Sequence, residues 1–565
     1  MSKIIIKQLV AMLLMTFVLS AVPNDNNASK ALEIALKKNP KKILKNIPQK
    51  KFLKTLYRQN HYHPLWIQSG QLNQKKYTQL FQQIEQDITL NHEGMLYKNY
   101  QILSKRVDGN FTQEQLLHTE IKLSSVYYNF LIHAIYGEIE WKNFTHKLSA
   151  LKRKKINATW IKYQPKFNIV KLMQSPDINQ SISSVTPKNF GYKKLLLALK
   201  KLQTIKEKSP WKKLPSFKRL ALGDGGDMVL KLRTRLEASG DYIECNKTNT
   251  STIRTKENNL SKDNNLSKNA LFNTCLDSAV KNFQSRHGLS VDGIVGKGTQ
   301  KALNISIDEK IATILLNIDR IKWLPREEQT RFLIVNIPEF MLHYIENSKE
   351  KQKLRVIVGQ PKHPTPIFSQ SISYIVLNPY WKVPEGIVRR EVIPALIKDP
   401  SYLRRHGLEV HRTWNENSAK INTNALFWED YLVPGNKFPY RIMQPPGPKN
   451  ALGKIKFKFP NRFSVYIHDT PTRHLFKKTI RAFSHGCVRL SKPTKLLETI
   501  ASFNTNINLT KANKILKGKR KTFLKVNKQL RVYLVYLTAG MNSQGQIEFR
   551  PDIYKYDKYQ KRRLR

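Results

Sequence analysis

The hydrophobic pattern changes once along this 565-residue chain, and that change restricts the fold more than any other feature. Residues 46–215 carry apolar residues at helical spacing, including Lys-rich amphipathic segments such as 195–202. After Phe332 the pattern becomes short apolar runs bounded by turn residues, which is typical of strands. These runs span 333–337, 342–345, 356–358, 375–377, 464–467 and 532–537. A helical half followed by strands predicts an α+β multidomain protein.

Length and composition indicate several packed domains. At roughly 150 residues per domain, three or four domains are expected, and 40% hydrophobic residues are enough for packed cores. We predict a helical scaffold domain over 46–215, a three-helix domain over 216–306, and a mostly β domain over 326–505. We expect the β domain to contain a mixed α/β insertion over about 386–440 and to be completed by C-terminal strands over 506–565.

The predicted three-helix domain is built around turn residues and short apolar stripes. Asp227 is the expected N-cap of its first helix, the second helix is expected to begin at Asp277, and the third runs from Thr299 through Leu303. The tract 246–270 between the first two helices is rich in Asn, Lys, Ser and Thr without apolar periodicity, so we expect an inserted loop.

The N-terminus has the pattern of a secretory signal over residues 1–22, with Lys3 and Lys7 before an apolar stretch at 9–19. An uncleaved membrane anchor is the alternative, although the stretch is shorter than the roughly 20 residues that a bilayer span needs. Export would allow Cys245 and Cys275, which flank the polar tract, to form a disulfide; two unpaired buried thiols are the alternative.

The formal net charge is +57, from 98 Lys plus Arg against 41 Asp plus Glu. Such an excess of positive charge is typical of nucleic-acid-binding proteins, but an exported protein does not encounter nucleic acid. Long-range attraction to carboxylate-bearing wall polymers or to an anionic membrane surface is one explanation. The other is a general drift toward lysine without a function.

A candidate catalytic site lies near the C-terminus, where fifteen residues separate His468 from the run Ser484-His485-Gly486-Cys487-Val488-Arg489. A free thiol near pKa 8.5 is mostly protonated, so acyl transfer from Cys487 needs a base and nearby positive charge. His468 fits the role of base, and His485 and Arg489 supply or orient charge. Gly486 permits a sharp turn in which the N–H groups of Gly486 and Cys487 hold an oxyanion.

Zinc binding is an alternative use of the same residues. His468, Asp469, His474, His485 and Cys487 could supply ligands. Structural zinc sites show closely spaced Cys or His pairs, whereas His485 and Cys487 have one residue between them, so the spacing favours the nucleophile and predicts neither a metal nor a cofactor.

The spacing of His468 and the Ser-His-Gly-Cys run resembles the signature of the L,D-transpeptidases, whose catalytic domain is of the YkuD type. The resemblance extends to the large Gram-negative members, which add an N-terminal scaffold and a peptidoglycan-binding domain. It is carried by Asn378-Pro379-Tyr380-Trp381-Lys382-Val383-Pro384, Asn450-Ala451-Leu452-Gly453, Phe459-Pro460-Asn461 and residues 538–552. Lys382, where a small polar residue is expected, and the polar tract are departures.

This resemblance implies 3→3 peptidoglycan cross-linking in the periplasm through a cysteine acyl-enzyme on tetrapeptide stems, with release of D-alanine. It implies substrate contacts at Tyr380, Trp381 and Ser484, a cap over the site at 386–440, and reaction of the thiol with carbapenems. Peptidoglycan stem peptides are the expected partner. Transfer of the same acyl group to water or to a protein lysine, and a non-enzymatic wall-binding scaffold, are the alternatives.

Overall fold

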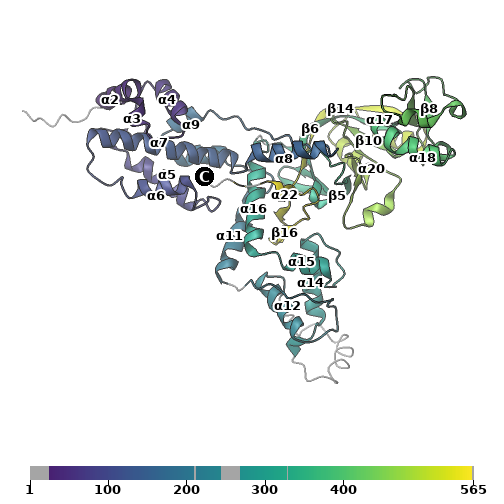
Figure 1. Ribbon diagram of the computed structural model, residues 1–565, viewed down its shortest axis with the longest axis horizontal. Helices are drawn as coiled ribbons and strands as arrows, with labels where there is room; N and C mark the ends of the chain where they lie inside the picture. Colours follow the sequence, from purple (N-terminus) through teal and green to yellow (C-terminus); the bar gives the residue numbers. More distant parts are fainter. Residues whose placement is uncertain (1–24, 209–210, 243–267, 327–328, 561, 563–565) are drawn as a thin grey trace, which may run out of the picture.

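The computed structural model describes residues 25–208, 211–242, 268–326, 329–560 and 562, so the predicted signal over 1–22 and nearly all of the polar tract lie outside the described residues. The molecule has a helical arm, a sheet-rich arm on the opposite side, and a small helical domain that projects from the region between them (Figure 1). The predicted α+β multidomain fold is therefore confirmed. Within the described residues, none of the helices is both long and apolar enough for a membrane span.

The helical arm is organised around the long helix α7, Gln113–Tyr136, whose N-terminus is closed by a capping box between Thr112 and Gln115. Buried Glu120 of α7 accepts hydrogen bonds from the backbone N–H groups of Leu65 (2.7 Å) and Trp66 (2.9 Å). The arm comprises α2 (Asp25–Lys38), α3 (Pro40–Ile43), α4 (Lys50–Gln59), β1 (Ile67–Gln68), β2 (Gln71–Leu72), α5 (Gln74–Gln86), α6 (Met95–Ser104), α7, α9 (Ile169–Gln174) and α10 (Ile178–Val185).

The helical arm differs from the predicted scaffold of residues 46–215 at its start and in two of the helices within that range. Leu32 and Leu36 of α2 lie in the arm's core, so its helices begin before residue 46. In contrast, α8 (Trp141–Arg153) packs into the core of the sheet-rich arm, and α11 (Tyr192–Lys208) packs on α16 (Ile307–Lys322). Amphipathic helices look alike in sequence whichever core they cover, so periodicity could not assign these two.

The projecting domain contains α12 (Asp227–Ala238), α14 (Thr274–Arg286) and α15 (Lys297–Leu303) around a core that includes Leu232 and Phe283. Two predicted boundaries were wrong. Gly226 is the N-cap of α12, and Asp227 is the first residue of that helix. The Asn273 side chain caps α14 by accepting from the Leu276 N–H (3.0 Å). Helix α14 therefore begins three residues before Asp277. Cys275 lies in α14, and its predicted partner Cys245 lies outside the described residues.

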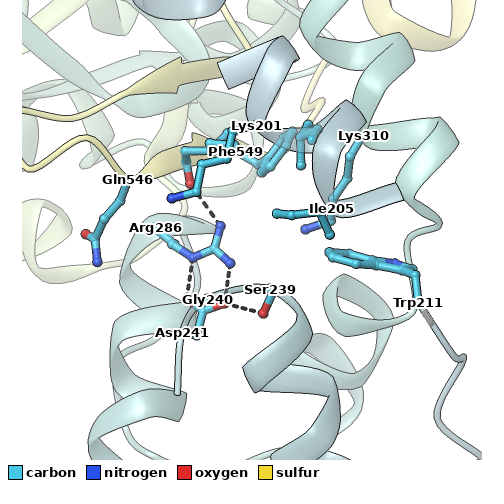
Figure 2. A pocket seen from close by; sticks show the side chains of 12 residues that line it. Lys201, Ile205, Trp211, Ser239, Gly240, Asp241, Arg286, Lys310, Gln546 and Phe549 are labelled. Carbon is cyan, nitrogen blue, oxygen red and sulfur yellow. Dashed lines mark hydrogen bonds and ion pairs between the residues drawn. The ribbon is translucent and has the colours of Figure 1, made fainter. Parts of the chain in front are cut away.

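A charged pocket joins the projecting domain to α11, α16 and the β-hairpin of β15 (Ala539–Met541) and β16 (Ile547–Phe549) (Figure 2). Buried Asp241 forms an ion pair with Arg286 and accepts a hydrogen bond from Ser239. Arg286 also donates to the Ile547 carbonyl (2.9 Å). Because the Arg286 guanidinium contacts both Asp241 of the projecting domain and Ile547 of the hairpin, the ion pair fixes the position of the domain on the hairpin.

Asp241→Asn is expected to destabilise the protein by about 3 kcal/mol, because it leaves the buried Arg286 guanidinium without its countercharge. Chemical denaturation with fluorescence detection measures this difference. Asp227→Asn is the matched control, since Asp227 pairs with Lys231 at the surface with both side chains well exposed, and such pairs contribute about 0–1 kcal/mol. Equal effects of the two substitutions would contradict a structural role for the buried pair.

The sheet-rich arm is built on one sheet with the strand order β12-β5-β13-β11-β10-β6-β14-β3-β4, and β4 also pairs with β5, which closes the sheet into a barrel. Alternate residues such as Leu333, Val356 and Ile375 fill its interior. Its strands are β3 (Arg331–Asn336), β4 (Met341–Glu346), β5 (Lys349–Gly359), β6 (Phe368–Leu377), β10 (Ile455–Lys458), β11 (Ile467–His468), β12 (Ala482–Ser484), β13 (Val488–Leu490) and β14 (Thr522–Val535). Helices α20 (Pro493–Ala501), α21 (Leu509–Lys517) and α22 (Tyr556–Tyr559) lie in the same arm.

The insertion between β6 and β10, called the cap below, forms a subdomain with its own core. It lies at the end of the molecule far from the helical arm (Figure 1). It is mixed α/β, as predicted. It contains β7 (Trp381–Lys382), β8 (Glu409–His411) and β9 (Arg441–Gln444) as a small sheet, with α17 (Glu385–Ile387), the π-helical turn η4 (Val388–Val392), α18 (Ile393–Lys398) and α19 (Tyr402–His406).

Candidate active site

Two neighbouring strands bring the predicted nucleophile and base together. β11 pairs in parallel with β13, with His468 opposite Arg489, and Cys487 immediately precedes β13. Ile467 and Val488 point into the barrel core, so period-two alternation places His468, Cys487 and Arg489 on the opposite face. Residues distant in sequence therefore share one face of the sheet.

The His468 imidazole is buried, and its Nδ1 lies 2.5 Å from the carbonyl oxygen of Asp469. A carbonyl can only accept, so Nδ1 carries the proton and Nε2 keeps a free lone pair. Burial lowers the pKa of His468 to about 3, and the positive charges of Arg489 and Lys456 act in the same direction. The imidazole is therefore neutral and has the tautomer that a base at Nε2 requires.

Asp469 holds the backbone segment that orients His468. Its carboxylate accepts from the N–H groups of Lys454 (2.9 Å) and Thr470 (2.7 Å) and pairs with Arg473. Gly453 has a positive φ of 57°, and a Cβ atom there would lie 2.4 Å from the Asp469 carboxylate. This contact gives a structural reason for glycine in the run Asn450-Ala451-Leu452-Gly453.

The Cys487 thiol is partly buried, and Sγ lies 3.8 Å from the carbonyl oxygen of Ser464. Burial raises the pKa of Cys487, although hydrogen bonds from Tyr466 and the charges of Lys456 and Arg489 partly offset that effect. The site face therefore carries a neutral thiol and a neutral imidazole at rest, and the thiolate forms only when a base removes the proton.

The turn before Cys487 is held by Ser484. Its Oγ donates to the Cys487 carbonyl (2.5 Å) and accepts from the Gly486 N–H (3.1 Å), while Gly486 has a φ of 113°. The Ser484 side chain is buried and its hydroxyl is engaged within the turn, although Ser484 is among the residues that line the cleft described below. The Gly486 N–H, a predicted oxyanion donor, has the Ser484 hydroxyl as its partner. Of the two predicted oxyanion donors, only the Cys487 N–H has no hydrogen-bond partner among the described residues.

A second set of hydrogen bonds braces the same turn from behind. The buried Thr365 hydroxyl donates to the Gly486 carbonyl (2.9 Å) and accepts from the Gly359 N–H (2.8 Å). Tyr554, from the C-terminal segment, donates to the Gly359 carbonyl (2.6 Å) and accepts from the Thr365 N–H (3.1 Å). The C-terminal segment therefore supports the cysteine turn through Thr365.

Thr365→Val is expected to lower the free energy of unfolding by about 1–3 kcal/mol, because it leaves two buried backbone groups without partners. Thr365→Ser keeps the hydroxyl and is the matched control; it should retain most of the stability. Thermal and denaturant unfolding of both variants tests this. If the Val and Ser variants were equally stable, the hydroxyl would have no bracing role.

The remaining predicted site residues lie in different places. Arg489 is on the site face, and its guanidinium donates to the Thr472 hydroxyl (3.3 Å). His485 turns toward the cap, where its Nε2 lies 2.6 Å from the Glu391 carboxylate, and its ring lies 4.8 Å from that of His363. Trp381 lines the cleft described below, but Tyr380 does not line it and lies beside Lys521.

Cys487 and His468 open into a cleft of about 810 Å³ between the barrel, the cap and α8. Its cap side includes Trp381, Ile387 and Arg390, and its opposite side includes Leu148 and Lys152 of α8. No group of three or more His, Cys, Asp or Glu that could hold a metal ion occurs in the part of the chain that the structure describes. The cleft is large enough for a peptide-sized ligand.

Lys456 and Tyr466 are site residues that the sequence reasoning missed. Lys456 lies opposite His468 on β10, and its Nζ is 3.7 Å from the centroid of the Tyr466 ring. Burial lowers the pKa of Lys456 to about 8. The alternation of Tyr466-Ile467-His468 could have placed Tyr466 on the site face, but only strand pairing places Lys456 there.

Three family models match separate parts of the chain. An L,D-transpeptidase catalytic domain (YkuD) matches residues 330–512, a scaffold domain matches 51–199, and a peptidoglycan-binding domain matches 225–303. A Haemophilus influenzae protein named "Putative L,D-transpeptidase" is 33% identical over 260 residues, which is 46% of this chain and half of the length of that protein.

Solved structures with similarity include an L,D-transpeptidase fragment from Xylanimonas cellulosilytica (14% identity, 57% of this chain and 99% of that chain, TM-score 0.17). An L,D-transpeptidase from Stackebrandtia nassauensis is also similar (12% identity, 57% of this chain and 96% of that chain, TM-score 0.20). These TM-scores are too low to support an inference, so the family assignment depends on the sequence matches. The chain carries the YkuD catalytic domain of the L,D-transpeptidase family, together with a scaffold domain and a peptidoglycan-binding domain.

Proposed function

We propose that the chain is a periplasmic L,D-transpeptidase that forms 3→3 cross-links between peptidoglycan stems. The observation that carries the proposal is the pairing of β11 with β13, which puts Cys487 and a neutral His468 on one face with the His468 Nε2 available. The YkuD match over the same residues supports the reaction class. The peptidoglycan-binding match supports the wall as the substrate polymer.

The first half-reaction forms a thioester. His468 Nε2 removes the thiol proton, and Sγ attacks the carbonyl that precedes the terminal D-alanine of a tetrapeptide stem. The Cys487 N–H donates to the oxyanion of the tetrahedral intermediate. The C–N bond then breaks, the proton on His468 passes to the leaving amine, and D-alanine departs.

The second half-reaction transfers the acyl group to an amine of a neighbouring stem. That amine loses a proton to His468 as it attacks the thioester, an amide bond forms, and the S–C bond breaks to restore the thiol. The cap excludes water from the acyl-enzyme when it covers the cleft, which favours an amine acceptor. With water or a protein lysine as acceptor, the same intermediate would give a carboxypeptidase or an attachment enzyme.

Incubation of the purified protein with disaccharide-tetrapeptides, followed by mass spectrometry, tests this function. The expected products are free D-alanine and a dimer that has lost one D-alanine. Tripeptide without dimer would identify a carboxypeptidase. Intact tetrapeptide would contradict the enzyme proposal and favour a wall-binding scaffold.

A further inference from the structure

The helical region supplies one side of the catalytic cleft. Thr145, Leu148, Ser149 and Lys152 of α8 line the cleft that contains Cys487, as do residues 157–160. Helix α8 lies within the scaffold match, whereas the cysteine lies within the catalytic-domain match. Figure 1 shows α8 beside the sheet-rich arm, at the end of the helical region. This side of the cleft, Thr145–Lys152 with residues 157–160, is called the α8 wall below.

The α8 wall is fixed to the barrel by a packed core and by backbone hydrogen bonds. Phe144 and Leu148 are buried in the barrel's core cluster, and the Phe144 ring lies 5.7 Å from that of Tyr556. The Ile161 N–H donates to the Ile367 carbonyl (2.8 Å), and the Ile367 N–H donates to the Thr159 carbonyl (2.9 Å). A wall held in this way keeps a constant position relative to Cys487, as a specificity site requires.

The charges that line the cleft have one sign. Lys152 from the α8 wall, Arg390 from the cap and Arg462 from the loop before β11 are exposed cations on its lining, and Arg489 lies deeper. No Asp or Glu lines the cleft among the described residues, and none of the three exposed cations has a carboxylate partner there. The nearby Glu391 of the cap is paired with His485. Such a cleft attracts anionic ligands.

We propose that the α8 wall is a subsite for a carboxylate of the substrate peptide, with Lys152 as its specificity-determining residue. The ligand class is an acidic peptide whose free carboxylates lie outside the bond that is cleaved. This inference rests on the proposed function and names the part of the stem that the scaffold domain recognises. The helical region then contributes directly to substrate choice, and removal of charge at Lys152 weakens binding without changing the nucleophile.

Binding measured without turnover tests the subsite separately from the reaction. Titration calorimetry would use the full chain carrying Cys487→Ala, an acidic tetrapeptide stem, and the same peptide with its side carboxylates converted to carboxamides. Lys152→Glu is the test variant. Lys147→Glu is the matched control, because Lys147 is exposed on the same helix but does not line the cleft.

Lys152→Glu is expected to raise the Kd for the acidic peptide about tenfold and to change the Kd for the carboxamide less than about twofold. Lys147→Glu is expected to leave both values within about twofold. The subsite is overturned if Lys152→Glu and Lys147→Glu weaken binding of the acidic peptide equally. It is also overturned if Lys152→Glu weakens binding of the acidic peptide and of the carboxamide equally. Absence of D-alanine release by the wild-type chain would instead overturn the proposed function, since these binding contrasts do not depend on catalysis.

Discussion

Cys487→Ala is expected to abolish D-alanine release and cross-linking, with a loss of at least about 10⁴-fold in kcat, because no other group in the cleft can form the thioester. The alanine side chain is smaller than the thiol and fits the same turn, so the fold should be retained. Release of D-alanine is measured by a coupled assay, and cross-linked product by mass spectrometry. Intact mass after exposure to a carbapenem gives an independent readout: one adduct on the wild-type chain and none on the variant.

His474→Ala is the control that separates acyl transfer from the zinc alternative. His474 is exposed and has no role in the proposed reaction, although it was a candidate zinc ligand. If the protein is an acyl transferase, this variant should keep wild-type activity, whereas a zinc site that used His474 would lose metal.

Cross-linking that persisted in Cys487→Ala at more than about 10⁻⁴ of the wild-type rate would remove the cysteine from the mechanism.

His468→Asn is expected to lower kcat by about 10²–10⁴-fold, the usual contribution of a positioned general base. Asparagine keeps an N–H donor near the position of Nδ1 and can still bond the Asp469 carbonyl, but it has no group in place of Nε2. The substitution therefore removes the base while the hydrogen bond that fixes the segment is retained. Melting temperature within a few degrees of wild type confirms that the loss is chemical.

The pH dependence of cysteine alkylation tests the protonation state of the pair. Burial raises the pKa of Cys487 and lowers that of His468 to about 3, so less thiolate is present at neutral pH than for a free cysteine near 8.5. Iodoacetamide should therefore react with Cys487 at a rate that keeps rising through the alkaline range. A plateau reached near pH 6 would indicate a resting thiolate–imidazolium pair and would contradict the neutral pair.

Most of the candidate site could be predicted because its chemistry is local in sequence. The order of residues around Gly486 and Cys487 requires a turn, and His468 follows an apolar run. The cysteine turn and the candidate base were therefore identifiable without coordinates. Lys456 could not be found in this way, because its relation to His468 depends on the pairing of β10 with β11. The use of the Gly486 N–H by Ser484 was likewise missed, since side-chain acceptors compete for backbone donors only in the folded turn.

The sequence by itself determined the fold class and the order of helical and β regions, and it supplied Cys487 and His468 as the candidate pair, because hydrophobic period and residue chemistry are properties of short segments. Only the tertiary structure decided which core each helix joins. Helix α8 has the same amphipathic pattern as its neighbours in the helical arm, yet Phe144 and Leu148 pack into the barrel and bring Lys152 to the catalytic cleft. An apolar stripe specifies that a helix is buried on one side, and the surface that covers it is chosen by the fit of distant side chains.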